Sequence, residues 1–405
     1  MKKLSKLICA SIVFLQGTCL QAYQPYHAII ADGAVSATVS APNLNDLSSD
    51  LKTTGLELLI PTYTPTSAVA IGFDLRGVKA LTFFAADSTT LVVHIPQTGT
   101  TETFLGATRD ESIQLFKEFL RDGGDKTHLL RAYAKYSPID PIAGNPNSLM
   151  SQMAQADYLM GRLTPLSGCD CSWSAQPIVH QFQAGVHAGR AFSKSYDTTI
   201  VTLPLRYSYS PNHDWALVLD APFTYNRNGG ASSFFGSLGF GLRVPVTHEW
   251  SLTPTVRAGA GGSLDLCTAG TFVSTGLLSE YQYKISKYVL SMTNYAGYFT
   301  STNFWLSGVN FNYHLHDWVL KNGLTFTSCE GYEIFCRPLN FSVSVIDSYF
   351  PGHRLYIKHY DEVNVSLFTT GINPRLDYDC LSFGFAYQFG DKDYKGYSLN
   401  LDYQF

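Results

Sequence analysis

The chain has 405 residues, a formal net charge of −4, and 14% aromatic residues. Charged residues make up only 15% of it, against about 25% in soluble domains. The low charge disfavours an ordinary soluble protein. The negative sign disfavours nucleic acid as a partner.

The first 22 residues have the features of a secretory signal peptide. Lys2, Lys3 and Lys6 precede an apolar run over residues 7–15, and Ala22 offers a small residue at the cut. The run is too short to span a bilayer, which takes about 20 residues. Removing the three lysines takes the formal charge from −4 to −7. Six cysteines remain that can pair in an exported protein: Cys169, Cys171, Cys267, Cys329, Cys336 and Cys380.

Residues 23–165 predict a small α+β domain. Largely apolar runs at residues 56–60, 68–75, 78–85 and 90–95 indicate buried strands. Thr108 and Glu111 form a capping box that starts a helix. A second short helix is expected near residues 129–133. Asn145 and Pro146 resemble the start of a third helix, which carries Leu149, Met150, Met153 and Met160.

After a linker at residues 166–179, the pattern over residues 180–405 changes to a period of two. Leu203, Leu205 and Tyr207, for example, alternate with Pro204 and Arg206. A soluble β-sandwich alternates too, but its strands are typically about 5–6 residues long. The runs here have about 10 residues, the length that a tilted membrane strand needs. We therefore expect a transmembrane antiparallel β-barrel of 12 to 14 strands, and a mainly β protein.

The last strand carries a resemblance to a known class. Apolar and polar residues alternate to the end of the chain, as in the C-terminal strands of Gram-negative outer-membrane β-barrels, which typically end on an aromatic residue. The resemblance implies an outer-membrane location, contact with outer-membrane lipid, and barrel assembly factors that recognise this ending. A leading domain before a barrel also resembles autotransporters. The residues of the C-terminal signal are Tyr397, Leu399, Leu401, Tyr403 and Phe405.

Loop lengths suggest an orientation. Short turns at residues 210–213, 247–249, 286–287 and 350–353 are expected in the periplasm, and longer loops at 226–232, 262–270 and 328–338 outside. Phe405 should be periplasmic. The domain at 23–165 is expected in the periplasm too, because Arg206, Arg243 and Arg257 take up space in the lumen.

Charged residues on the polar phase of the strands are candidate pore-lining groups. They either bias an open pore or pair with one another and plug it. They are Arg206, Asp220, Arg243, Arg257, Glu280, Lys284 and Asp402.

The sequence indicates no catalytic motif, no metal site and no cofactor. Cys329 and Cys336 bracket a loop and are a candidate disulfide. Three functions fit the pattern: a pore for small solutes, which the sequence favours, an autotransporter-like translocator that displays its first domain, and a structural or adhesive surface protein. The solute and the oligomeric state do not follow from it.

Overall fold

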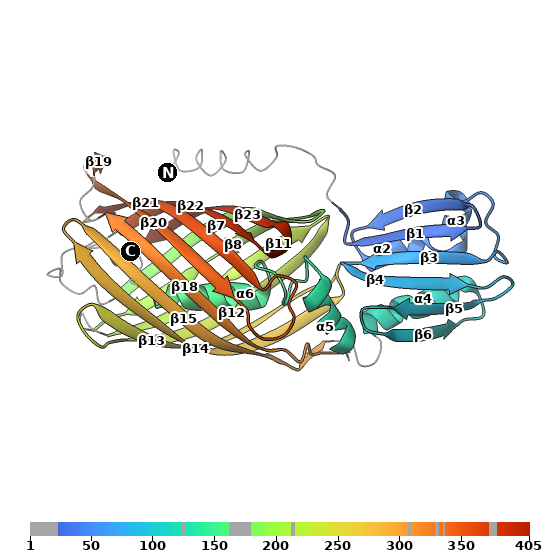
Figure 1. Cartoon of the computed structure of the whole chain (residues 1–405), viewed down its shortest axis with the longest axis horizontal. Helices are drawn as coiled ribbons and strands as arrows, with labels where there is room; N and C mark the ends of the chain where they lie inside the picture. The colour runs from blue at the N-terminus through green and yellow to red at the C-terminus, as the bar shows by residue number, and fades with distance from the viewer. Residues whose placement is uncertain are drawn as a thin grey trace.

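The computed structural model describes residues 23–122, 127–161, 180–211, 215–306, 309–328, 332–334, 337–371 and 379–405. A small α+β domain and a long β-barrel lie end to end along the molecule (Figure 1). Among the described residues, no helix is both long and apolar enough to cross a membrane. The expected signal peptide, the linker at 166–179 and Cys169, Cys171, Cys329 and Cys336 lie outside the described residues.

The domain is built on one antiparallel six-stranded sheet in the order β2-β1-β3-β4-β5-β6. Three expected strands are confirmed as β3, β4 and β5. The strands are β1 (Tyr26–Asp32), β2 (Val35–Ala41), β3 (Val69–Leu75), β4 (Val78–Phe84), β5 (Thr90–Ile95) and β6 (Thr100–Leu105). Helices α2 (Leu44–Asp50) and α3 (Thr53–Leu59) connect β2 to β3, and α4 (Arg109–Asp122) follows β6.

The strand expected at residues 56–60 is wrong, because these residues belong largely to helix α3. Leu56 and Ile60 are buried while Leu58 is 85% exposed. Burial of two residues four apart is helical, and a short apolar run does not separate the two structures by itself. The capping box before α4 forms: the Glu111 amide donates to the Thr108 hydroxyl at 3.2 Å, and the Glu111 carboxylate accepts from the Ala107 amide at 2.6 Å.

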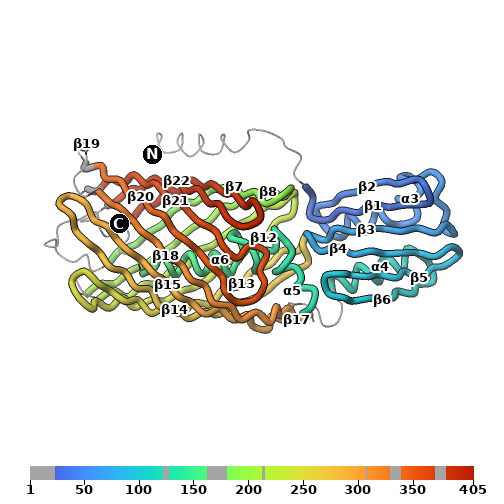
Figure 2. The backbone as a smooth tube through the Cα atoms, in the orientation of Figure 1, coloured from blue at the N-terminus to red at the C-terminus, as the bar shows by residue number. Residues whose placement is uncertain are grey.

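The next two expected helices are present but do not lie on the sheet. Helix α5 (Thr127–Tyr136) lies at the mouth of the barrel, and α6 (Leu149–Met160) lies inside it (Figures 1 and 2). Helix α6 begins at Leu149 after Ser148, three residues later than the Asn145-Pro146 start that the sequence suggested.

The described residues form a closed barrel of twelve antiparallel strands, at the low end of the expected range. Pro204 and Pro222 divide two of the twelve into β8 with β9 and β10 with β11, because proline cannot donate to the ladder. The barrel strands are β7 (His180–Ser193), β8 (Tyr196–Leu203), β9 (Leu205–Tyr209), β10 (Ala216–Asp220), β11 (Phe223–Asn228), β12 (Ala231–Pro245), β13 (Trp250–Ser263), β14 (Thr268–Ile285), β15 (Tyr288–Thr302), β18 (His316–Ser328), β20 (Arg337–Tyr349), β21 (His359–Gly371), β22 (Asp379–Gly390) and β23 (Tyr394–Gln404).

Three short strands lie outside this count. Strands β16 (Phe304–Leu306) and β17 (Val309–Phe311) form a separate hairpin, and β19 (Tyr332–Ile334) pairs only with β20.

The two faces of the barrel wall differ as the two-residue period predicts. Leu219 is 40% exposed on the outer face, whereas its neighbour Asp220 is 3% exposed and points inward. Large apolar side chains cover the outer face on every one of the twelve strands, among them Phe182, Leu238, Val256, Leu277, Leu324, Val345, Leu367, Phe383 and Leu399. An apolar wall of this kind fits lipid rather than water.

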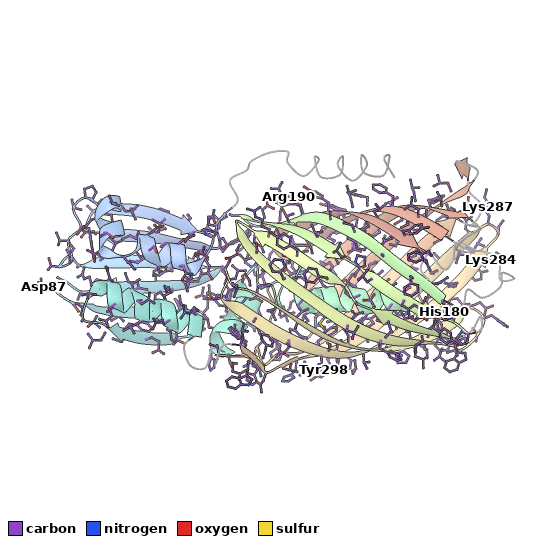
Figure 3. All side chains as sticks on the ribbon, turned by 180° about the vertical axis from the view of Figure 1, so that it is seen from behind. Asp87, His180, Arg190, Lys284, Lys287 and Tyr298 are labelled. Carbon is purple, nitrogen blue, oxygen red and sulfur yellow. The ribbon has the colours of Figure 1, made fainter. Side chains whose placement is uncertain are left out.

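The barrel has two rims, which we name by what lies at them. His180 and Phe405 lie at the C-terminal rim, together with the turns at 246–249 and 286–287. The domain rim carries the turns at 194–195, 229–230 and 264–267, and the segments 350–358 and 391–393. The α+β domain lies beyond the domain rim, as the position of Asp87 opposite Lys284 and His180 shows (Figure 3).

The expected sorting of loops by length is wrong at two places. Residues 350–353 lie at the domain rim, and the 328–338 segment lies between β18 and β20 at the C-terminal rim. The loop at 226–232 is a two-glycine turn at Gly229 and Gly230, both with positive φ. Loop length therefore does not orient this barrel.

Phe405 and the first domain lie at opposite rims, so they cannot both face the periplasm as expected. The even strand count does bring His180 and Phe405 to one rim, as expected. The assumption that failed is that the lumen has no room for the chain, because α6 occupies it.

We expect Leu367→Arg to destabilise the barrel by about 2–4 kcal/mol, the cost of a cation near the middle of a lipid-facing strand. Leu367 is 45% exposed on the outer face, whereas its neighbour Ser366 lines the lumen. Ser366→Arg is the matched control and should cost less. Unfolding titrations in lipid vesicles measure both, and equal losses would contradict the assigned faces.

We expect deletion of Phe405 to lower the folded fraction more than Phe405→Ser does. The Phe405 backbone closes the seam between β23 and β7, donating to Phe182 at 2.9 Å and accepting from it at 2.7 Å. The serine variant loses only the ring, whose centroid lies 5.9 Å from that of Phe182. Heat-modifiable mobility of membrane-extracted protein measures the folded fraction. Wild-type levels for the deletion would contradict a role in closure.

Candidate functional site

The candidate site is the lumen with helix α6 in it. Near the start of α6, Leu149 lies close to Gly259 of β13, and at its end Met160 lies close to Gly239 and Gly241 of β12. The helix thus runs from the domain rim toward the C-terminal rim. Its 12 residues span about 18 Å.

Inward-facing glycines make room for the helix. A Cβ at Gly241 would lie 2.5 Å from Met160 Sδ, and one at Gly259 would lie 2.7 Å from Met153 Sδ. Both distances are shorter than real Cβ contacts. A larger residue at either position would force the methionine side chains of α6 to move, so the glycines let α6 approach the wall closely.

An ion network fastens α6 to the wall. Arg257 of β13 donates from Nε to Asp157 of α6 at 2.7 Å and from Nη1 to Asp220 of β10 at 3.0 Å. Arg206 of β9 donates to the other oxygen of Asp220 at 3.1 Å, and to the Leu159 carbonyl of α6 at 3.1 Å. Tyr295 donates to Asp157 at 3.1 Å.

The network is electrically balanced and buried. It holds two arginines and two aspartates, and the Arg257 and Asp157 side chains are both 0% exposed. Breaking such a pair by removing one partner typically costs about 3–5 kcal/mol, because the other charge stays buried. The Arg257–Asp157 pair therefore fixes both the depth and the rotation of α6.

The remaining predicted lumen residues divide into three groups. Arg243 and Glu280 point inward, where Arg243 Nε donates to Ser251 Oγ at 3.2 Å and Glu280 is 1% exposed. Asp402 accepts from His187 at 3.1 Å, away from α6. The expectation that Lys284 lines the pore is wrong. It lies on the inward phase of β14 but is exposed at the C-terminal rim (Figure 3).

Helix α6 does not fill the lumen. The helix packs against β10 and β12–β15. A cavity of about 240 Å³ remains between the helix and the opposite wall. Gln152, Gln155 and Leu159 face this cavity from α6, and mostly hydroxyl and amide groups line it from β7 and β20–β23. Its charged lining residues have both signs: Asp220, Glu362, Asp402, Arg190 and Arg206.

A second buried network holds the α+β domain on the rim. Arg76 of the domain lies 3.6 Å above the ring of Tyr133 in α5, and 3.8 Å from Asp140 in the loop after α5. Asp140 accepts from Tyr313 of the barrel at 3.0 Å. Burial raises the pKa of the Tyr133 hydroxyl although Arg76 opposes the shift, so that phenol stays neutral.

Backbone contacts reinforce this junction. The amides of Tyr356 and Ile357, in the segment between β20 and β21, donate to the carbonyls of Ala134 and Gly144 at 2.9 Å each. Tyr23 packs edge-on against Tyr196 of β8 with ring centroids 5.1 Å apart. One continuous buried core runs from the domain through these contacts into the barrel.

The sequence analysis missed Asp157, Tyr295 and His187 as members of the lumen site. One signal was available for α6: Gly239 and Gly241 sit on the inward phase of β12, where an empty lumen would not require small residues. Asp157, a buried acid on a helix with no other charged residue, also demands a cation, which no residue of α6 supplies.

We expect Arg257→Met to loosen α6 in the lumen and to destabilise the protein by about 3–5 kcal/mol, since Asp157 then stays buried without its cation. Conductance across planar bilayers should rise, because α6 leaves the lumen more often. Lys284→Met removes a cation at the exposed rim and is the control.

Adding Asp157→Asn to Arg257→Met should restore part of the stability by removing the stranded charge. Wild-type conductance and stability for Arg257→Met alone would contradict the anchoring role.

No protein-family model matches the chain, and neither does any curated protein. Solved structures similar to the barrel include the β domain of the Bordetella autotransporter BrkA (11% identity, TM-score 0.43, 56% of this chain and 99% of that chain). The translocator domain of the autotransporter NalP from Neisseria meningitidis is similar as well (13%, 0.43, 63% and 97%). An outer membrane channel from Pseudomonas putida F1 matches at 12% and 0.39, over 57% and 97%. Likeness at this level does not say what this chain carries or binds.

Proposed function

We propose that the barrel is an outer-membrane translocator and anchor for its own N-terminal domain, with α6 as the plug that remains in the lumen. The domain lies on the outer side of the membrane, and the C-terminal rim faces the periplasm. One polypeptide joins a domain at one rim to a barrel whose first and last strands begin and end at the other rim, with α6 between them.

The single observation that carries this proposal is the place of α6. The Asp157 side chain of α6 is hydrogen-bonded to Arg257 on the inner wall of a closed barrel, while residues 26–122 form a folded domain beyond the domain rim. A helix that was merely stored in the lumen would not need a wall with matching glycines and arginines. The fit of Gly241, Gly259 and Arg257 to α6 supports a lumen that keeps this segment as its permanent occupant.

Two features support the membrane and the orientation. The outer wall is apolar around the whole barrel, which fits lipid. Phe405 lies at the seam between β23 and β7, and the resemblance of the alternating strand β23 to strands of outer-membrane barrels supports a C-terminal rim that faces the periplasm. Since the domain lies at the opposite rim, it is then outside.

A narrow polar pore is a second candidate function, favoured by the cavity beside α6. Its lining on β7 extends from Gln183 to Ala191, about 26 Å along the strand. Its lining holds the carboxylates of Glu362 and Asp402, and also Arg190 and Arg206, which pair with Asp197 and Asp220. The conductance of the wild-type protein, measured beside Arg257→Met, decides whether this path conducts while α6 is in place.

We expect an epitope inserted after Asp87 to bind antibody on intact cells, and one inserted between Ser286 and Lys287 to bind only after the outer membrane is permeabilised. Asp87 lies at the far end of the domain and Lys287 at the C-terminal rim (Figure 3). Both sites are turns, so both insertions leave the strands intact.

Each insertion is the control for the other, because the two lie at opposite ends of one molecule. Heat-modifiable mobility confirms that each variant is folded. Antibody access to the 286–287 epitope alone on intact cells would reverse the orientation and overturn displayed-domain function.

A further inference from the structure

Three metal-ligating side chains meet on the outer wall of the barrel, near the domain rim. They are Asp347 of β20 and His359 and Asp361 of β21, and their ligand atoms all lie within 4.8 Å of one another. His359 Nε2 lies 2.6 Å from Asp347 Oδ1. The sequence analysis expected no metal site, and nothing in the translocator function requires one.

The place of these residues is unusual for a lipid-facing wall. The same outward phase carries Val343 and Val345 on β20 and Val365 and Leu367 on β21, all at least 37% exposed. Tyr349, the register partner of His359, is also exposed. An aromatic residue at this height is typical of the interfacial girdle, so the three polar residues lie at the level of lipid headgroups.

The register of β20 and β21 brings two negative charges close together. Asp347 and Asp361 are direct cross-strand partners, and like charges in that position repel each other. One imidazole is shared between them, so even a protonated His359 leaves a net negative charge. Asn322 of β18 is the register partner of Asp347 and donates to its second oxygen at 3.4 Å. A divalent cation would neutralise both carboxylates at once.

We propose that Asp347, His359 and Asp361 bind a divalent transition-metal ion, with Zn²⁺ as the best fit. Zinc takes imidazole nitrogen and carboxylate oxygen together, commonly from three protein side chains with a fourth position open. Mg²⁺ and Ca²⁺ prefer all-oxygen sets and make less use of His359. The open position faces away from the barrel, toward the headgroup layer, so water or a lipid phosphate oxygen completes the site.

The bound ion links β20 to β21, because its ligands come from both strands. These strands flank the segment 350–358, whose backbone holds α5 and the loop after it. Binding at Asp347 and Asp361 therefore stabilises the part of the rim on which the α+β domain rests. The site does not depend on the proposed function, because it requires only the folded barrel.

The test uses the purified full chain folded in detergent, freed of metal and then titrated with ZnCl₂. We expect Zn²⁺ to raise the melting temperature of the wild-type protein. In Asp361→Asn the zinc affinity should fall at least tenfold, because a ligand is lost while the Asp347–His359 contact stays. Each variant is compared with itself without zinc, so a change in its intrinsic stability does not disturb the result.

Asp402→Asn is the matched control. Asp402 also pairs with a histidine, His187, but inside the lumen and without a third ligand in the described contacts. This variant should keep the wild-type zinc response, and any zinc bound by cysteines is common to all three proteins. An equal zinc response in wild type and Asp361→Asn, or none in wild type, would show that the cluster is only an ion pair and would overturn the proposal.

Discussion

The buried pair between Asp157 and Arg257 is the interaction on which the arrangement of the whole molecule depends. A barrel of twelve strands encloses more space than its own inward side chains fill when many of them are glycine, serine and threonine. Helix α6 takes up that space, and the ion network fixes where it lies. Without the helix, Arg257 and Asp220 would still pair, but the glycines of β12 and β13 would face a void.

The same logic of burial extends to the domain rim. Arg76, Tyr133 and Asp140 come from the sheet domain, from α5 and from the loop before α6, and Tyr313 comes from the barrel. Removing one partner of a buried charge typically costs about 3–5 kcal/mol. The domain is therefore held in one orientation on the barrel rather than tethered loosely, and α6 and the domain share a single buried core.

The barrel could be predicted because its signal is local. Alternation with a period of two is carried by each strand separately, and the outward phase needs only lipid as its partner. The position of α6 was harder to predict, because Leu149, Met150 and Met153 suit a soluble core and a barrel lumen equally well, and only the inward glycines of β12 point to an occupied lumen. Loop lengths misled for a related reason: the segment 350–358 is long because it holds α5, a contact between residues about 220 apart. The Asp347–His359–Asp361 cluster depends on the register between two strands, which no local pattern reveals.

Helix α6 passes through the closed barrel, so the barrel and the helix are interlocked. The sheet of six strands is a folded body at one end of α6, and the barrel surrounds the helix itself. Strand β23 pairs with β7 and closes the barrel around the helix. The folded domain then prevents the withdrawal of α6 through the barrel. The two parts can separate only if the seam between β23 and β7 opens or the domain unfolds. Once assembled, the two parts stay together for mechanical reasons, in addition to the energy of their contacts.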